Sequence, residues 1–482
     1  MPAARAQQPR RASLAVPTFA VGIPLLLLSL GTANPGHTAA AIASAMCVAL
    51  LLWRPGEPPV LLFVAGMQWL QGAVEVFHAD VLGEPLYAMS ETRGLEDATL
   101  LTLIWVAVFA LGLRLALIGR APVPLAEVPL GAISPRLAFR IYLAWTAALV
   151  VLERVPVGGL RQALVAATDF RWAIVFALFW MVLRQRQNWH LLGLVFVAEV
   201  ATGFLSFFSD FKTPVYLLAI AALAADYRLR ARQALGFALV GVFALYLGTL
   251  WSAIKMDYRD TLNEGTGKQV TTISRGEQVR ALLDLLGTVD AEVLEVGLDN
   301  FVERFAYVEQ FARVLDYVPA MVGHADGELH AAALRHVLMP RLFFPNKPAL
   351  VSDTEMAERY TGHMLVYEGR ATSISVGTPA DGYIDYGYSG MHLSALLLGL
   401  LVGLSYRFVL TLKGQHQALA SSLAVALVLP LSTVELTVVK LVGGMLTRVI
   451  LVVLLWKFAI PMALSLLASR RRHQEAKPSS AR

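Results

Sequence analysis

Cysteine is almost absent from this sequence: Cys47 is the only one among 482 residues. A single cysteine excludes an internal disulfide framework and every Cys-x-x-Cys metal or redox site. Charged residues are also scarce, at 16%, compared with about 25% in soluble domains. Because 57% of the residues are hydrophobic, the composition excludes a soluble enzyme and a disordered chain. It predicts a polytopic membrane protein.

Several catalytic motifs are missing as well. The sequence has no His-Glu-x-x-His, no phosphate-binding P-loop, no Gly-x-Gly-x-x-Gly after a strand and no nucleophile elbow. Four histidines of the later half, His324, His330, His336 and His363, are too irregularly spaced to indicate a metal site. The first external loop, residues 34–37, contains no acidic pair. These absences favour metal-independent chemistry, or none, and no cofactor is expected.

What the sequence does contain is a series of apolar runs of membrane-spanning length. A helix needs about 20 apolar residues to cross a hydrocarbon core of about 30 Å. The predicted fold class is therefore an all-α polytopic integral membrane protein with about twelve transmembrane helices. The runs cover residues 14–32, 38–53, 59–77, 97–118, 137–153, 171–184, 189–208, 213–226, 233–253, 391–411, 417–434 and 446–467. The sixth and eighth are short, and each is either re-entrant or extended through a charged flank.

Basic residues near the ends of these runs indicate the orientation, because cytoplasmic connections carry an excess of Lys and Arg. With a cytoplasmic N-terminus, both termini are cytoplasmic and nearly every basic connection falls on the cytoplasmic side. These connections contain Arg54, Arg120, Arg136, Arg184, Arg186, Arg228, Arg230, Arg232, Arg407, Lys413 and the run Arg470 to Arg472. The predicted location is the cytoplasmic (inner) membrane.

Charge also divides the chain into parts. Residues 254–390 hold 12 basic and 20 acidic residues, a net charge of −8, whereas the rest of the chain has +13. The basic balance therefore reflects topology and anionic lipid rather than nucleic acid, which we exclude as a partner. We predict a membrane domain at 1–253, an extracytoplasmic loop domain between the ninth and tenth spans at 254–390, further spans at 391–468 and a basic tail at 469–482.

The extracytoplasmic loop domain changes character along its length. Residues 275–318 place apolar side chains at three- and four-residue spacing, which predicts amphipathic helices. Residues 339–390 are dense in Pro and Gly, which predicts an ordered, irregular loop without long helices. Carboxylates and tyrosines lie between residues 355 and 388 and suit carbohydrate binding. The alternative is a solvated loop whose tyrosines pack at the membrane interface.

Basic residues at membrane-depth positions on the external side form the main candidate site. Lys212 lies in the segment GFLSFFSDFKTP, Arg341 and Lys347 lie in MPRLFFPNKP, and Lys440 and Arg448 flank Gly443 and Gly444. Charges there are costly unless they are paired. Either they pair with nearby acids such as Glu199, Asp210 or Glu435 or reach lipid headgroups, or several of them converge on a diphosphate, which Arg and Lys bind well.

The segment MPRLFFPNKPALVSDTEMAERYTG, followed by GTPADGYIDYGYSGMHLSALLLGLLVG, resembles the bacterial oligosaccharide repeat-unit polymerases of the O-antigen and exopolysaccharide polymerase family. The resembling features are Pro340-Arg341, the Pro-x-Lys-Pro sequence at 345–348, the acidic and aromatic stretch at 381–386, and Gly387 with Gly390. Lys212 occupies the position of an earlier basic segment in such polymerases. The resemblance implies a glycosyltransferase C-like fold.

The resemblance also implies an activity and assigns roles to residues. A growing glycan moves from one polyprenyl diphosphate to a sugar hydroxyl of another lipid-linked repeat unit, outside the cytoplasmic membrane. The implied partners are polyprenyl-diphosphate-linked oligosaccharides, membrane lipid and, as a further candidate, a chain-length regulator. The diphosphate would be bound by Arg341, Lys347, Lys212, Arg448 and Arg304. The attacking hydroxyl would be deprotonated by Asp381, Glu358 or His336, and the saccharide path would be lined by Tyr360, Tyr383 and Tyr386.

Other functions fit the same sequence. An O-antigen ligase would use the same donor, membrane and leaving group, and a flippase or transporter of lipid-linked saccharides would bind the same molecule. A transporter commonly carries internal repeats, and the sequence shows none. A scaffolding membrane protein is the remaining alternative.

Overall fold

The computed structural model describes residues 14–128, 134–152, 167–205, 210–225, 231–266, 271–339, 344, 346–347, 351–364, 374–412, 417–433 and 435–462. Over these ranges the regular elements are helices, so the expectation of an α-helical fold is confirmed. The predicted tail at 469–482, Arg341, Arg228, Arg230 and Lys413 lie outside the described residues.

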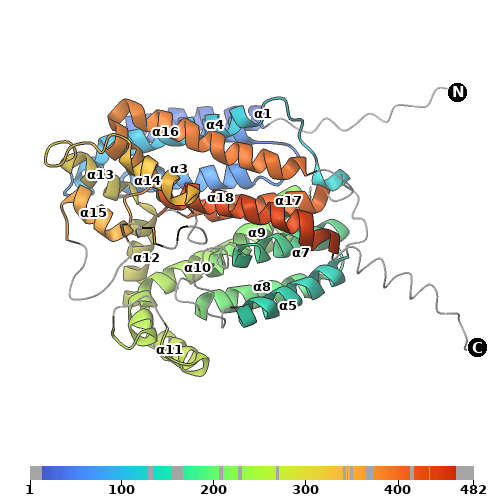
Figure 1. Cartoon of the computed structure of the whole chain (residues 1–482). Coiled ribbons are helices and arrows are strands. Elements are labelled where there is room, and N and C mark those ends of the chain that lie inside the picture. Colours follow the sequence, from blue (N-terminus) through green and yellow to red (C-terminus); the bar gives the residue numbers. More distant parts are fainter. Residues whose placement is uncertain are drawn as a thin grey trace, which may run out of the picture.

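Most helices run roughly parallel and form the body of the molecule (Figure 1). The body helices are α1 (Ala15–Leu28), α2 (Pro35–Leu52), α3 (Val60–Leu82), α4 (Leu95–Ala116), α5 (Pro135–Leu152), α7 (Arg171–Gln185), α8 (Trp189–Leu205), α9 (Thr213–Ala224), α10 (Ala231–Leu262), α16 (Thr378–Thr411), α17 (Gln417–Val428) and α18 (Val438–Leu454). Each of the twelve apolar runs of the sequence is mainly helical over its described residues. Shorter helices cover one end of this body, which we call the covered end: α11 (Arg275–Gly287), α12 (Ala291–Phe305), α13 (Val308–Tyr317), α14 (Glu328–Leu338) and α15 (Asp353–Thr361).

Among the described residues, six helices are long and apolar enough to cross a membrane. They are Pro35–Leu52, Val60–Leu82, Leu95–Ala116, Ala238–Leu262, Thr378–Thr411 and Val438–Met462. Four shorter apolar helices accompany them: Ala15–Gly31, Trp189–Leu205, Thr213–Ala224 and Gln417–Ser432. The chain is therefore a multi-pass membrane protein, while the number of twelve spans stays a prediction.

Glycines bring α4 and α16 into close contact at the centre of the body. A Cβ atom added at Gly399 would overlap the carbonyl oxygen of Phe109, and one added at Gly112 would overlap that of Leu396. Gly403, four residues after Gly399, faces Ala116 in the same way. Small residues spaced by four let the backbones of membrane helices approach, where dispersion contacts replace the hydrophobic effect. We call this closely packed pair of helices, α4 and α16, the spine.

Arginines gather at the end of the body opposite α11 to α15. Glu57 pairs with Arg54 and with Arg120, each at 2.7 Å. Arg407 donates to the carbonyl oxygens of residues 116 and 118, which are left unpaired where α4 ends, and Arg184 donates to those of residues 125 and 128. Arginines from four predicted cytoplasmic connections therefore contact the same stretch of chain and lie at the same end of the helical body.

The helices expected between 275 and 318 are present as α11, α12 and α13. Local capping explains where they begin: Ser274 and Glu277 form a capping box, and the Asp290 side chain accepts a hydrogen bond from the Val293 backbone. In Figure 1, α12 crosses the direction of the body helices. It thus lies across the covered end rather than extending a span.

The expectation of an irregular loop over residues 339–390 is wrong for its last part. Residues 378–386 are helical and belong to α16, which bends at Gly387, where φ is 65°. A positive φ is readily adopted by glycine, and the two segments of α16 pack closely because Gly382 lies against Met391. The Gly-rich pattern therefore marks a helical bend with close packing. Ser352 and Gly362 likewise bound a further short helix, α15.

Candidate functional site

Four basic side chains converge at the covered end. Lys255 on α10 lies within electrostatic reach of three other cations and one carboxylate: Lys212, Arg259, Arg304 and Glu435. All four basic residues are half-buried. We call them the cationic cluster. Of the charges that act on Lys255, three are positive and one is negative, so positive charge dominates around Lys255.

Helix packing explains why these residues meet. Lys255 and Arg259 are four residues apart on α10 and share one face of the helix. Gly297 of α12 sits so close to α10 that an added Cβ would lie 2.8 Å from the Cβ of Ala253. Arg304 lies two turns beyond Gly297 on α12, and its charge acts on both Lys255 and Arg259. Lys212 ends the short η5 turn (Asp210–Lys212) that begins α9.

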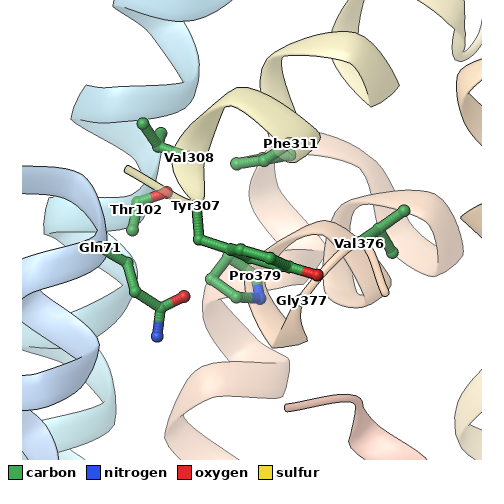
Figure 2. A pocket seen from close by; sticks show the side chains of 8 residues that line it. All are labelled: Gln71, Thr102, Tyr307, Val308, Phe311, Val376, Gly377 and Pro379. Atoms are coloured by element: carbon green, nitrogen blue, oxygen red, sulfur yellow. The ribbon is translucent and has the colours of Figure 1, made fainter. Parts of the chain in front are cut away.

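A small cavity of about 10 Å³ lies between α3, α4, α13 and the start of α16. It is lined by Gln71, Thr102, Tyr307, Val308, Phe311, Val376, Gly377 and Pro379, and the Tyr307 ring lies across it (Figure 2). The Tyr307 hydroxyl donates to the Ser375 carbonyl oxygen and accepts from the Ser375 backbone N–H at 3.0 Å.

Tyr307 connects this pocket to the cationic cluster. Burial raises the pKa of the Tyr307 phenol above its ordinary value, and the negative charge of Glu435 raises it further. Glu435 also acts on Lys255 and Arg259. The phenol therefore stays protonated near neutral pH, as a hydrogen-bond donor beside a positively charged region.

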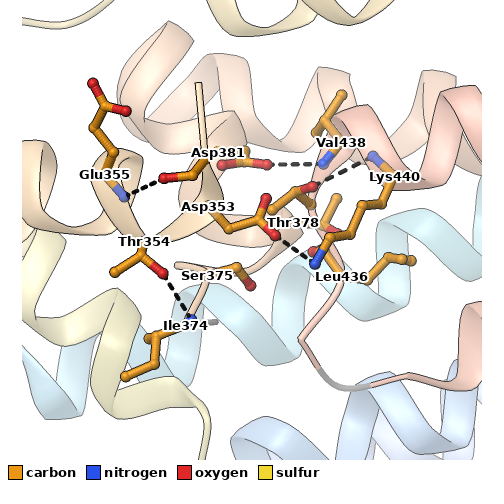
Figure 3. Close-up of polar contacts among 12 residues, drawn as sticks. Asp353, Thr354, Glu355, Ile374, Ser375, Thr378, Asp381, Leu436, Val438 and Lys440 are labelled. Atoms are coloured by element: carbon orange, nitrogen blue, oxygen red, sulfur yellow. Dashed lines mark hydrogen bonds and ion pairs between the residues drawn. The ribbon is translucent and has the colours of Figure 1, made fainter. Parts of the chain in front are cut away.

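The first turns of α15, α16 and α18 meet next to this region (Figure 3). Asp381 is buried and accepts a hydrogen bond from the Val438 backbone N–H at 2.8 Å. Thr378 donates to the Leu436 carbonyl oxygen at 2.6 Å, and Lys440 pairs with Asp353 at 2.5 Å. Asp381 thus satisfies one of the free N–H groups at the start of α18, a structural role.

A second polar constellation joins α14 to α16. His330 Nδ1 lies 2.5 Å from an Asp385 oxygen, and His330 Nε2 lies 2.6 Å from Ser394 Oγ. Asp385 also accepts from the backbone N–H groups of Leu329 and His330, at 3.0 and 2.9 Å. Asp385 and Ser394 stand on either side of the bend at Gly387, so His330 bridges both segments of α16. We call Asp385, His330 and Ser394 the relay.

The structure separates the residues predicted to bind a diphosphate. Lys212 and Arg304 come together in the cationic cluster. Arg448 contacts Asp169 through Nε at 2.9 Å and through a terminal nitrogen at 2.8 Å, so its charge is already balanced. Lys347 donates to the His336 carbonyl oxygen at 2.8 Å. Arg341 lies outside the described residues.

The residues predicted to act as bases or to line a saccharide path are dispersed. Glu358 and His336 are half-buried, on α15 and α14. Tyr360 and Tyr383 are buried, and the Tyr383 hydroxyl donates to the Val318 carbonyl oxygen. Both rings pack in the protein interior, which argues against their lining a saccharide path. Tyr386 is 44% exposed and packs its ring against His330.

Sequence reasoning missed five residues of these constellations: Lys255, Arg259, His330, Asp385 and Ser394 do not appear among the assigned roles. The four-residue spacing of Lys255 and Arg259 after an apolar run was a readable signal. His330 and Asp385 are 55 residues apart in the chain, and no local pattern reveals that contact. Within the described ranges, no group of three or more His, Cys, Asp or Glu side chains is placed to hold a metal ion.

Comparison with known proteins identifies a family without assigning an activity. No curated protein matches the chain, and no solved structure matches it. A family model described as "Domain of unknown function (DUF8712)" matches residues 134–408. That range runs from α5 into α16 and includes the whole cationic cluster and the whole relay. Because the match covers more than half of the 482 residues, the chain belongs to the DUF8712 family.

Proposed function

We propose that this protein is a glycosyltransferase that joins polyprenyl-diphosphate-linked oligosaccharide repeat units into a surface polysaccharide. The observation that carries the proposal is the cationic cluster, in which three other basic residues act on Lys255 at the covered end of a membrane-embedded helical body. The family resemblance of the sequence around residues 340–390 supports the same activity.

The position of the cluster suits a lipid-linked diphosphate. Lys255 and Arg259 occupy the last two turns of the membrane-spanning segment Ala238–Leu262. A polyprenyl diphosphate has its negative charge at that depth, because its tail stays in the hydrocarbon and its sugar projects outward. Basic side chains there would stabilise the diphosphate as negative charge grows on the leaving oxygen. Holding both lipid-linked substrates in one membrane would supply much of the rate by orientation.

The arginine-rich end of the body supports an orientation. Arg54, Arg120, Arg184 and Arg407 lie at the end opposite the cationic cluster, and basic connections favour the cytoplasm. In the proposed topology the covered end faces outward from the cytoplasmic membrane and both termini are cytoplasmic. The partners are then lipid-linked oligosaccharides, membrane lipid and a chain-length regulator.

The proposed orientation has a direct test. A cysteine placed at Ser352, which is exposed at the start of α15, on a Cys47→Ser background should react with a membrane-impermeant maleimide from outside the cell. Labelling of that site only after the cytoplasm is opened would contradict the orientation.

The activity is tested with purified protein in lipid vesicles and a polyprenyl-diphosphate-linked repeat unit, with product length followed on a gel. Wild-type protein should lengthen the chains without other enzymes. Lys255→Ala, Arg259→Ala and Arg304→Ala should each lower turnover by about 10- to 100-fold, the value of one hydrogen bond to a charged group. Arg280→Ala, which removes an exposed arginine of α11, is the matched control and should keep wild-type turnover.

Other outcomes point to the alternative functions. Cluster variants with wild-type turnover would contradict the assignment of the diphosphate site. Transfer of finished chains to a lipid acceptor, without lengthening, would indicate a ligase. Movement of the intact lipid-linked substrate between leaflets, without a new glycosidic bond, would indicate transport.

A further inference from the structure

The relay of Asp385, His330 and Ser394 has hydrogen-bond geometry that fixes the state of the imidazole. Asp385 accepts two backbone N–H groups and faces His330 Nδ1, so all its contacts in this group are with hydrogen-bond donors. A carboxylate that accepts in this way orients Nδ1 as the protonated nitrogen. His330 Nε2 then carries the lone pair, and Ser394 donates its hydroxyl hydrogen to it at 2.6 Å.

From this geometry we infer that His330 is the proton acceptor for the attacking sugar hydroxyl, that Ser394 relays the proton, and that Asp385 is the positioning residue. The inference rests on the proposed glycosyl transfer and names the base for it. His330 is 16% exposed in its side chain, and the Asp385 carboxylate is fully buried. Ser394, which would take the proton first, is only 4% exposed, so the acceptor hydroxyl has to enter beside the partly exposed His330 ring.

Intermediate charged residues connect the relay with the cationic cluster. The charges of His330 and Asp385 act on Asp381, as does that of Asp353. Asp353 and Glu435 both act on Tyr307, and Glu435 acts on the cluster. The base and the diphosphate site therefore stand on one side of the membrane, at the same end of the helical body.

The proton and electron movements balance. The acceptor hydroxyl gives its proton to Ser394 Oγ as the Ser394 proton passes to His330 Nε2. The acceptor oxygen forms a bond to the anomeric carbon while the bond from that carbon to the diphosphate oxygen breaks, and its electron pair leaves with the diphosphate. The resulting imidazolium faces the Asp385 carboxylate, which stabilises its charge. It then returns the proton to the departing diphosphate.

Other charged groups around His330 have assigned contacts. On α16, Asp381 accepts a hydrogen bond from the Val438 backbone N–H, and the Tyr386 ring packs against the His330 imidazole. From α18, which packs against α14, Lys440 is paired with Asp353. On α15, the Tyr360 phenol lies within reach of the Asp385 charge.

The test is the pH dependence of chain lengthening by the purified full-length protein. Wild-type turnover should fall on the acidic side as the base is protonated. His330→Ala should lower turnover by about 10² to 10⁴-fold and abolish that acidic limb. Added imidazole should restore part of the turnover, and with it the pH dependence. Ser394→Ala should slow turnover while keeping the acidic limb, because His330 is still present.

His324→Ala is the matched control for loss of a histidine that fastens the same segment. His324 Nδ1 contacts the carbonyl oxygens of Tyr383 and Ile384, next to the bend. This variant should keep the acidic limb even if its thermal stability falls. His330→Ala protein that is folded and retains wild-type turnover and pH profile would overturn the inference alone. Wild-type protein that lengthens no lipid-linked oligosaccharide would overturn the inference together with the proposed function.

Discussion

Arg448 and Asp169 form a two-point ion pair across the helical body, although 279 residues separate them in the chain. Both side chains are mostly buried, at 14% and 23% exposed. Gly444 makes room for the guanidinium, since an added Cβ would lie 2.9 Å from one of its nitrogens. The pair fastens α18 to the segment that begins α7, so we expect Arg448 to act in stability.

Arg448→Ala should therefore lower the stability of the detergent-solubilised protein by about 1 to 4 kcal/mol, because it leaves the Asp169 charge without its partner. Asp169→Asn should destabilise less, since an amide carries no charge. Thermal unfolding of both variants and of the double variant gives the coupling energy. An Arg448→Ala protein with wild-type stability and reduced turnover would instead favour the diphosphate role.

Close packing between α4 and α16 predicts a second effect. Gly399→Ala should destabilise the protein by about 1 to 3 kcal/mol, since its methyl group meets the Phe109 backbone carbonyl and the helices must separate. Gly193→Ala is the matched control, because no atom lies within 4 Å of a Cβ added at that helical glycine. It should be neutral or slightly stabilising. Equal melting temperatures for the two variants would contradict the proposed spine.

The sequence was sufficient to predict the helices of the body, because apolar runs of membrane length have few other structures available. Where the structure describes them, all twelve runs are mainly helical. It also predicted that Arg54, Arg120, Arg184 and Arg407 share one side, since the same charge rule acts on every connection. These are properties of segments, and a sequence displays them locally.

Contacts between distant segments could not be predicted in this way. The Pro and Gly density before residue 390 indicated irregular backbone, but the buried Asp381 and Asp385 find backbone N–H partners on α18 and α14. Those hydrogen bonds allow polar residues to lie inside a packed helix, which the local pattern could not reveal. Arg448 looked like a free cation for the same reason, because Asp169 approaches it only after folding.

Tyr307 predicts a pH effect whose sign follows from its burial. Its raised pKa means that the folded state favours the protonated phenol. The corresponding stability is complete below the unfolded pKa of about 10 and is lost as the pH rises through the folded value. Tyr307→Phe should therefore lose less stability than wild type between pH 9 and 11 (roughly the range in which free tyrosine ionises). Denaturation curves at several pH values test this, and parallel alkaline losses would contradict it.

Variants of Asp381 distinguish a structural role of its carboxylate from a role as the catalytic base. Asp381→Asn keeps an oxygen that can accept from the Val438 N–H, so it should cost little stability and keep most of the turnover. Asp381→Ala leaves that N–H unpaired at the start of α18 and should cost about 1 to 2 kcal/mol, the value of a lost helix cap. Turnover and melting temperature are measured on both variants. If Asp381→Asn were stable but abolished chain lengthening, Asp381 would be the base, and His330 would then be left as a link between α14 and α16.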